Sequence, residues 1–480
     1  MLLAAPLRAQ DGVLDPETLP YVAVYRLVAT ADPVAAEASG APLTPTFITQ
    51  AGMSLNGQLL AWVSEERPEI WLYVSDFAGA QLSSSKFPRD AGGVWEMETT
   101  NSGVFLRSSL GAVWHSDASA SLSPWFTGSP AVSFVREIAA PAGGELVYAI
   151  ADRGVDANDL FSLPGQGPPL KLADSTDIPC PPIQGCRGVW TLSNLDVSAD
   201  ASVLALMTTG FFVRGDDGID RSIDHDEALT LTGGGWRYQT YDLPLGPILG
   251  PLSLSPDGNM LVLHGAVQET PSVLTRRWLA LATGGGPMAQ LARQDFNVAA
   301  AALNGDGSLA LLDLSQLAVT DGSFALDLFP TWNVQGITLA ATNDLAMTPD
   351  GRQIAFRTST TGFYTGVLND PAALAGAPIA ITGVSLFDGV LTVTTTGPVD
   401  RMTLDAVQNG RLLTEQQPAP WRCAGPPRDD GQPPDTTAAD GHFTTTCARQ
   451  SGEAMSIRLG AATAGQGWVI VMDVPVGGID

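Results

Sequence analysis

The chain of 480 residues is poor in positive charge. It has 24 Lys and Arg residues against 50 Asp and Glu residues, which gives a formal net charge of −26, and lysine stands only at Lys86 and Lys171. A surface this acidic repels nucleic-acid phosphates, so the composition argues strongly against nucleic-acid binding. Charged residues make up only 15% of the chain and hydrophobic residues 45%. That balance indicates a folded protein rather than a disordered one.

Long apolar runs and common catalytic motifs are also missing. No stretch of 18 or more apolar residues occurs, so no helix is expected to span a membrane. The patterns G-x-S-x-G, H-E-x-x-H and the glycine-rich phosphate-binding motifs are absent. The four histidines are His115, His225, His264 and His442. Because no two of them lie within four residues of each other, a histidine-rich metal centre is not indicated. No catalytic residue is assigned.

Cysteine is scarce, and its placement indicates disulfides. Cys180 and Cys186 enclose a short loop, while Cys423 and Cys447 enclose one rich in Pro, Asp and Gly. Neither pair has the C-x₂₋₄-C spacing of a zinc site with further ligands nearby. Two local disulfides predict a protein exported to an oxidising compartment, whether periplasm, cell surface or exterior. Residues 1–10 (MLLAAPLRAQ) agree, since they look like the end of a secretory signal.

Glycine and proline are abundant, at 51 and 35 residues, which favours many turns and few long helices. A turn followed by a short apolar strand recurs seven times. The final turn residues stand at positions 57, 103, 144, 201, 258, 307 and 351. Units of 40–50 residues with four short strands each are typical of a β-propeller. No unit has helical periodicity, which disfavours folds with alternating strands and helices.

Two of these units resemble a known repeat family. Residues 254–262 (LSPDGNMLV) and 346–356 (AMTPDGRQIAF) are similar to the TolB-type, WD-repeat-like propeller repeat, and residues 159–172 resemble its second half. The resemblance covers about residues 50–370, although only two turns keep the full Pro-Asp-Gly. It implies an all-β fold with a seven-bladed β-propeller over residues 11–375, with six or eight blades as alternatives. The family includes periplasmic scaffolds, peptidase propellers and some lyases, so the fold alone does not give the function.

The two ends of the chain have separate predicted roles. Residues 20–29 (PYVAVYRLVA) form an apolar segment that could supply the outer strand of the last blade and so close the ring. Residues 376–480 contain several short strands, among them a hairpin around Asp388-Gly389. This pattern predicts a small β-sandwich of immunoglobulin-like type.

An acidic segment at residues 214–227 is the candidate metal site. We expect it to form the loop between the second and third strands of the fourth unit. The six candidate ligands are Asp216, Asp217, Asp220, Asp224, Asp226 and Glu227. Calcium takes six to eight oxygen ligands, so clustered carboxylates suit it. The alternatives are a solvated acidic loop and a polar partner.

A partner-binding rim is predicted next to this segment. Loops between the second and third strands of a blade emerge on the same face as the connections between blades. The acidic segment, the loop at residues 152–159 and the Cys180–Cys186 loop are therefore expected on one face of units three and four. The candidate rim residues are Asp152, Asp156, Asp159, Trp190 and His264.

These features favour an exported, non-enzymatic propeller that presents one face to a protein partner, a ligand or an envelope assembly. The rival hypothesis is a metal-dependent lyase or hydrolase, with calcium as its metal, acting at the propeller mouth. A central channel lined by carboxylates with raised pKa would favour the enzyme, whereas a flat or plugged channel would favour binding. A third class, a structural envelope subunit, predicts an extended apolar patch. The oligomeric state is not predicted.

Overall fold

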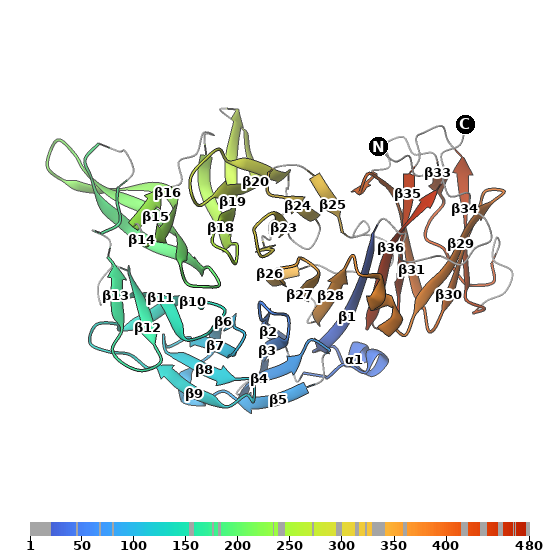
Figure 1. Cartoon of the computed structure of the whole chain (residues 1–480), viewed down its shortest axis with the longest axis horizontal. Helices are drawn as coiled ribbons and strands as arrows, with labels where there is room; N and C mark the ends of the chain where they lie inside the picture. The colour runs from blue at the N-terminus through green and yellow to red at the C-terminus, as the bar shows by residue number, and fades with distance from the viewer. Residues whose placement is uncertain are drawn as a thin grey trace.

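The structure is a computed structural model of the chain (Figure 1). It describes residues 21–44, 47–66, 69–78, 81–152, 158–174, 177–180, 184–233, 235–238, 245–270, 273–293, 300–312, 316–321, 324–328, 341–358, 362–413, 421–432, 439–449, 455–463, 465 and 467–476. The predicted signal remnant at residues 1–10 lies outside this part of the chain. Among the described residues, no helix has the length and apolar character needed to cross a membrane.

The chain is all-β. Its described helical elements are α1 (Pro33–Ser39) and the 3₁₀ turns η2 (Arg89–Ala91) and η3 (Pro371–Gly376). Six antiparallel sheets each consist of four consecutive strands and follow one another as the sectors of a ring (Figure 1). This arrangement is consistent with a β-propeller and confirms the prediction of an all-β fold built from four-stranded units.

The strands of the six sheets have the following bounds. The first three sheets are β2 (Phe47–Met53), β3 (Leu59–Glu66), β4 (Glu69–Asp76), β5 (Gln81–Lys86); β6 (Val94–Thr99), β7 (Gly103–Ser108), β8 (Val113–Asp117), β9 (Leu122–Phe126); and β10 (Phe134–Ala139), β11 (Leu146–Asp152), β12 (Asn158–Pro164), β13 (Leu170–Ala173). The next three are β14 (Cys186–Val197), β15 (Val203–Arg214), β16 (Asp220–Thr232), β17 (Gly235–Tyr238); β18 (Leu245–Leu254), β19 (Met260–Thr270), β20 (Val273–Ala282), β21 (Ala289–Arg293); and β22 (Ala301–Leu303), β23 (Leu309–Leu312), β24 (Gln316–Val319), β25 (Phe324–Asp327).

A larger sheet joins the ring to the C-terminal strands. Its eight strands run in the order β26-β27-β28-β1-β36-β35-β31-β32. They are β26 (Ala341–Met347), β27 (Gln353–Thr358), β28 (Gly362–Leu368), β1 (Val22–Thr30), β36 (Trp468–Val476), β35 (Met455–Ala462), β31 (Arg401–Gln408) and β32 (Arg411–Leu412). The pairing of β1 with β28 confirms that the N-terminal strand completes the last unit of the ring.

The remaining four strands form a separate sheet. Its order is β29-β30-β34-β33, with β29 (Ala380–Phe387), β30 (Val390–Thr396), β34 (His442–Arg449) and β33 (Trp421–Cys423). Leu391 and Val393 of this sheet share one buried cluster with Leu459 and Met472 of the larger sheet. The two sheets therefore pack face to face through their apolar side chains.

The recurring turns lie at one end of the ring, where the first strand of each sheet passes into the second. At Ser255, the hydroxyl donates to Asp257 at 2.6 Å and accepts the Met260 N–H at 2.9 Å, which fixes the turn from within. Backbone hydrogen bonds also join the turns of successive sheets, as from Ala142 to Ala199, from Ala199 to Pro256 and from Gly305 to Pro349. We call this end the turn face. The opposite end, where β2, β6, β10 and β14 begin, is the entry face.

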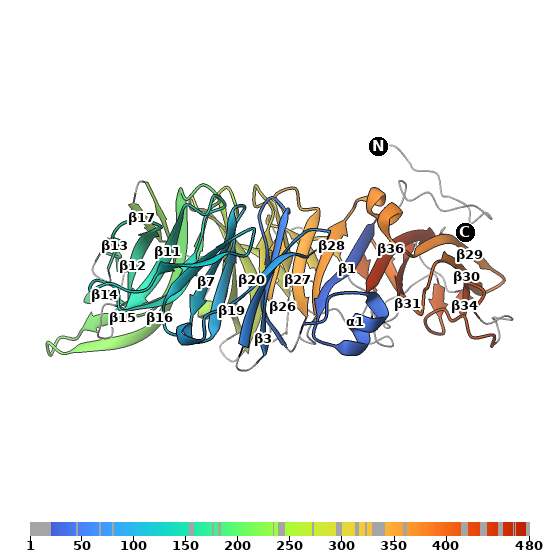
Figure 2. The ribbon, with the colours of Figure 1, turned by 90° about the horizontal axis from the view of Figure 1, so that it is seen from below.

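Buried apolar clusters fill the spaces between neighbouring sheets. Leu106 of β7 and Val74 of β4 belong to one such cluster, while Leu229 of β16 and Ile150 of β11 belong to another. The ring closes in the same way, because Phe363 of β28 packs against Trp62 of β3 with ring centroids 5.8 Å apart. Figure 2 shows the ring edge-on, with the sheets side by side.

Candidate functional site

The first strands of four units of the ring carry five carboxylates whose pKa values are raised by burial. Glu96 and Glu98 lie on β6, Glu137 on β10, Asp196 on β14 and Asp344 on β26. Burial raises the pKa of Glu98, and the nearby charges of Glu96, Asp196 and Asp344 raise it further. Asp196 and Asp344 belong to sheets that do not adjoin the sheet of Glu98, so these side chains must converge near the axis. We call the five residues the axial carboxylates.

Four axial carboxylates link their own sheet to the next one. Each accepts a hydrogen bond from a backbone N–H on the first strand of the following sheet. The pairs are Glu96 Oε2 with Ile138 at 3.1 Å, Glu137 Oε2 with Leu195 at 3.1 Å, Asp196 Oδ2 with Leu254 at 2.7 Å and Asp344 Oδ2 with Ala51 at 3.1 Å. These carboxylates therefore have a structural role between sheets.

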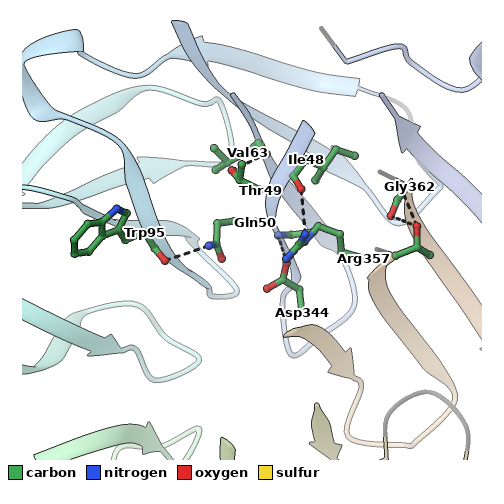
Figure 3. A network of polar contacts seen from close by, with 10 residues as sticks. Ile48, Thr49, Gln50, Val63, Trp95, Asp344, Arg357 and Gly362 are labelled. Atoms are coloured by element: carbon green, nitrogen blue, oxygen red, sulfur yellow. Dashed lines mark hydrogen bonds and ion pairs between the residues drawn. The ribbon is translucent and has the colours of Figure 1, made fainter. Parts of the chain in front are cut away.

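Two of these four carboxylates, Glu96 and Asp344, also accept hydrogen bonds from arginine side chains. Arg107 Nε donates to Glu96 Oε2 at 2.7 Å, and Arg357 Nε donates to Asp344 Oδ2 at 2.5 Å. Figure 3 shows Arg357 between Asp344 and the carbonyl of Ile48, which it also reaches at 3.3 Å. Both guanidinium groups are largely buried, which strengthens their attraction to the carboxylates.

Burial raises the pKa of every axial carboxylate. It raises the pKa of Glu96 to about 7 despite the opposing effect of Arg107, and the pKa of Asp196 to about 6. The pKa values of Glu137 and Asp344 are also raised by burial. Desolvation disfavours the charged form, so these groups exchange protons nearer neutral pH than ordinary carboxyls.

Glu98 differs from the other four. Burial raises its pKa well above the usual range, and repulsion from Glu96, Asp196 and Asp344 adds to the effect. Within the part of the chain that the structure describes, no donor makes a hydrogen bond to this carboxyl. Glu98 is therefore the axial carboxylate with no visible structural role.

The entry face carries most of the exposed large hydrophobic side chains of the ring. The structure describes five in the six four-stranded sheets and their turns, and four of them lie at this face: Phe47, Trp95, Leu110 and Ile219, against Leu170 at the turn face. Phe47 and Trp95 are 67% and 57% exposed and lie at the starts of the adjacent strands β2 and β6.

Trp95 is also held in place. The Arg107 guanidinium carbon lies 5.5 Å from the centroid of its ring, and Arg107 is itself fixed by Glu96. The Trp95 carbonyl accepts a hydrogen bond from Gln50 Nε2 at 3.1 Å (Figure 3). An exposed aromatic ring braced from one side offers its other surface at a small cost in side-chain entropy.

The acidic segment at residues 214–227 is mostly not the loop that the sequence predicts. β15 runs to Arg214 and β16 begins at Asp220, so only residues 215–219 form the turn of a long hairpin. The backbone pairing continues to the ends of both strands, with Val213 opposite Arg221 and Arg214 opposite Asp220. Figure 2 shows this hairpin extending beyond the neighbouring sheets.

The described carboxylates of this hairpin lie in separate places along it. Asp217 is paired with Arg221, and Asp220 lies 4.0 Å from Arg187. Asp216 is exposed. The described residues include no group of three or more His, Cys, Asp or Glu side chains suited to a metal ion. The candidate ligands Asp224 and Asp226 have side chains outside the described part, and Glu227 is half-buried. The calcium prediction therefore stays a prediction.

Two of the five predicted rim residues, Asp159 and His264, are buried rather than exposed on a rim. Asp152 lies at the entry face and pairs with Arg136 at 2.5 Å. Asp159 is fully buried, 3.6 Å from Lys171 Nζ, and His264 is buried against Trp278 with ring centroids 5.0 Å apart. Burial argues against direct contact of Asp159 or His264 with a partner. Asp156 and the Trp190 side chain lie outside the described residues.

Both predicted disulfides are present. Cys180 pairs with Cys186 in the connection between β13 and β14, and Cys423 pairs with Cys447 across β33 and β34. The first loop adjoins the acidic hairpin as predicted, because Arg214 N–H donates to the Gly185 carbonyl at 2.8 Å. Two disulfides indicate folding in an oxidising compartment.

Sequence reasoning missed the axial carboxylates, although a signal was present. In five of the seven units, a polar residue stands four positions before the first residue of the repeated turn, inside a strand that is otherwise largely apolar. These residues are Gln50, Glu96, Glu137, Asn194 and Asp344. Three of these residues are axial carboxylates, whereas Glu98 and Asp196 lie two positions nearer the turn. The pattern therefore points to part of the group only.

Comparisons with known proteins show a similarity of fold only. No protein-family model matches the chain, and no curated protein matches it. Among solved structures, oligogalacturonate lyase in complex with manganese is 12% identical, with a TM-score of 0.45, over 77% of this chain and 99% of that one. TolB from Acinetobacter baumannii and BamB from Moraxella catarrhalis are each 10% identical, with TM-scores of 0.36, over 67% of this chain.

These alignments cover 66% of TolB, just under two thirds of its length, and 85% of BamB. The chain thus has a distant structural similarity to β-propellers. No sequence family is assigned by these comparisons.

Proposed function

We propose that the chain is an exported, non-enzymatic β-propeller of seven blades with a C-terminal immunoglobulin-like β-sandwich, and that its entry face binds a protein partner. A count of seven blades is supported by the six four-stranded sheets together with the unit β26-β27-β28-β1. The sandwich corresponds to β29–β36, and the disulfides favour the bacterial periplasm or cell surface.

The observation that carries the proposal is the concentration of exposed hydrophobic side chains at the entry face, with Phe47 and Trp95 on adjacent strands. Aromatic residues, Trp above all, are enriched among the side chains that contribute most to protein–protein binding. The axial carboxylates support a binding scaffold, because four of them hold neighbouring sheets together and so make the ring a rigid support.

The test is binding by the intact protein. Partners are captured from an envelope extract of the native host, purified, and titrated against the wild type and the variant Phe47→Ala/Trp95→Ala. We expect a Kd at least about tenfold weaker for the variant, since truncating central aromatic contacts costs about this much. The matched control is Phe387→Ala, at an 82% exposed site on β29. Equal affinity of wild type and double variant would contradict the proposal.

A metal-dependent lyase or hydrolase acting near the axis is the second candidate. The raised pKa values of the axial carboxylates favour it, above all that of Glu98, which has no structural hydrogen bond among the described residues. Groups with perturbed pKa values are concentrated at catalytic sites, although structural networks also perturb them. The roles of Glu96, Glu137, Asp196 and Asp344 between sheets place this candidate second.

A calcium titration by calorimetry on the intact protein tests this candidate and the hairpin site together. Saturable heat that is lost in Glu98→Gln would support an ion near the axis. Heat lost instead in Asp224→Ala/Asp226→Ala would support the hairpin as a calcium site. No saturable heat in the wild type would rule out both sites.

A further inference from the structure

The N-terminal strand β1 lies between two parts of the molecule that the sequence pattern separates. It pairs with β28 of the ring on one side, with Ala23 opposite Leu368. On its other side it pairs with β36 of the C-terminal strands, with Val24 opposite Ile470. The backbone hydrogen bonds of one strand thus make the last unit of the ring and the C-terminal strands a continuous sheet.

The two faces of β1 contribute to two different cores. Tyr25 is buried in the core of the ring, beside Phe356 of β27 and Leu311 of β23. Val22 and Val24 are buried in the core between the two C-terminal sheets. Successive side chains of a strand point to opposite faces. A movement of β1 therefore displaces its side chains from the ring core and from the C-terminal core at the same time.

A buried ion pair fixes this junction. Arg458 of β35 and Asp473 of β36 form two hydrogen bonds, at 2.6 and 2.8 Å, and are 0% and 2% exposed. The Arg458 guanidinium lies 4.7 Å from the centroid of the Tyr21 ring, and Asp473 N–H donates to the Tyr21 carbonyl at 2.9 Å. A buried pair of this kind tolerates little rearrangement, since separation would leave a charge without compensation.

The strand is also tied at both ends. Asn369 N–H, after β28, donates to the Val22 carbonyl at 2.7 Å, and Leu27 N–H donates to the Gly467 carbonyl at 2.9 Å. These bonds come from the ring and from the C-terminal strands respectively. β1 is therefore held by both parts along its length.

We propose that β1 couples the last unit of the ring (β26–β28) and the C-terminal strands into one cooperative unit, so that loosening or stabilising either of these two parts changes the other. The coupling through β1 does not depend on the partner proposed for the entry face. A ligand bound by the C-terminal strands would accordingly stabilise the closure of the ring.

Hydrogen exchange of the intact chain tests the coupling. Ile457→Val removes one methylene from the C-terminal core at a residue of β35 that lies outside the ring and outside β1. We expect amides of β27 and β28 in the ring to exchange about two- to tenfold faster, together with those of β35 and β36. The reciprocal variant, Ile354→Val on β27, should accelerate β35 and β36 as well.

The matched control is Ile150→Val on β11, fully buried between the third and fourth sheets. It should accelerate exchange in β10–β12 and leave β35 and β36 unchanged. Acceleration confined to residues 380–476 in Ile457→Val, with β27 and β28 unchanged, would overturn the coupling. Because Ile→Val typically costs only about 0.5–1.5 kcal/mol, we expect these variants to stay folded, and a thermal unfolding curve of each confirms this before exchange is measured.

Discussion

At the scale of single residues, the axial carboxylates combine two properties that usually conflict. Glu96 and Asp196 accept backbone hydrogen bonds, which favour the charged form, yet burial raises their pKa values to about 7 and about 6. A carboxyl whose pKa is higher in the folded than in the unfolded state binds more protons when folded. Its contribution to stability is complete below the unfolded pKa and is lost as the pH rises through the folded pKa.

The first prediction follows from the direction of this change of stability with pH. The free energy of unfolding should fall as the pH rises from about 4.5 to about 7, by at most about 1.4 kcal/mol per pH unit for each carboxyl involved. Glu98→Gln removes the repulsion from Glu96, Asp196 and Asp344, so it should be more stable than the wild type at pH 7.5 and show a shallower fall. Denaturant titrations at several pH values measure both effects.

The matched control for this prediction is Glu145→Gln, at an exposed carboxyl on the turn face. It should leave the pH profile of the wild type unchanged. A profile for Glu98→Gln identical to that of the wild type would show that this carboxyl does not carry the pH dependence.

At the scale of elements, the turns were the most predictable feature. Proline presets φ, aspartate bonds its own backbone and glycine accepts positive φ, so Pro-Asp-Gly marks a turn without any tertiary information. Gly258 and Gly351 indeed have φ values of 74° and 71°. In the fourth unit Ala201 takes the same place with φ of 63°.

The second prediction concerns this turn. A side chain with a Cβ in the left-handed region is strained, so Ala201→Gly should raise the free energy of unfolding by about 0.5–1 kcal/mol after the entropic cost of glycine. Ala199→Gly, two residues earlier and without positive φ, should instead lower it. Denaturant unfolding measures the free energy of unfolding of both variants. A lower free energy of unfolding in Ala201→Gly than in the wild type would contradict backbone strain at Ala201.

The third prediction concerns the two disulfides, which close loops of different lengths. The sequence separations are 24 residues for Cys423–Cys447 and 6 for Cys180–Cys186. By the loop-entropy relation, replacing both cysteines by alanine should cost about 3.5 kcal/mol at the longer loop and about 2 kcal/mol at the shorter one. Thermal unfolding of the two double variants ranks them, and a larger loss at the shorter loop would contradict this account.

The acidic segment shows where local patterns were insufficient. Its charges and glycines predict a loop, but the pairing of β15 with β16 extends the strands to Arg214 and Asp220. Strand length there depends on the partner strand, and a count of turn-forming residues does not contain that information. The axial carboxylates were missed for a related reason, because their convergence depends on the closure of the ring.

At the scale of the whole molecule, the four-stranded repeat and the all-β class could be predicted from the sequence, since each unit repeats a local pattern. The eight-stranded sheet could not, because β1 and β36 lie at opposite ends of the chain and local patterns do not reveal pairing at that distance. Sequence composition suggested a division near residue 375. The shared strand joins the two sides of that division into one sheet.

The most direct test of the proposed function is site-specific photo-crosslinking in the native host. A photoreactive side chain replaces Phe47 on the entry face, and in a second protein it replaces Glu145 on the turn face. We expect a discrete protein adduct from position 47 and none from position 145. When the position-47 protein also carries Trp95→Ala, the adduct should be lost. Equal labelling from both faces, or no adduct from position 47, would contradict the assignment of the entry face as the binding surface.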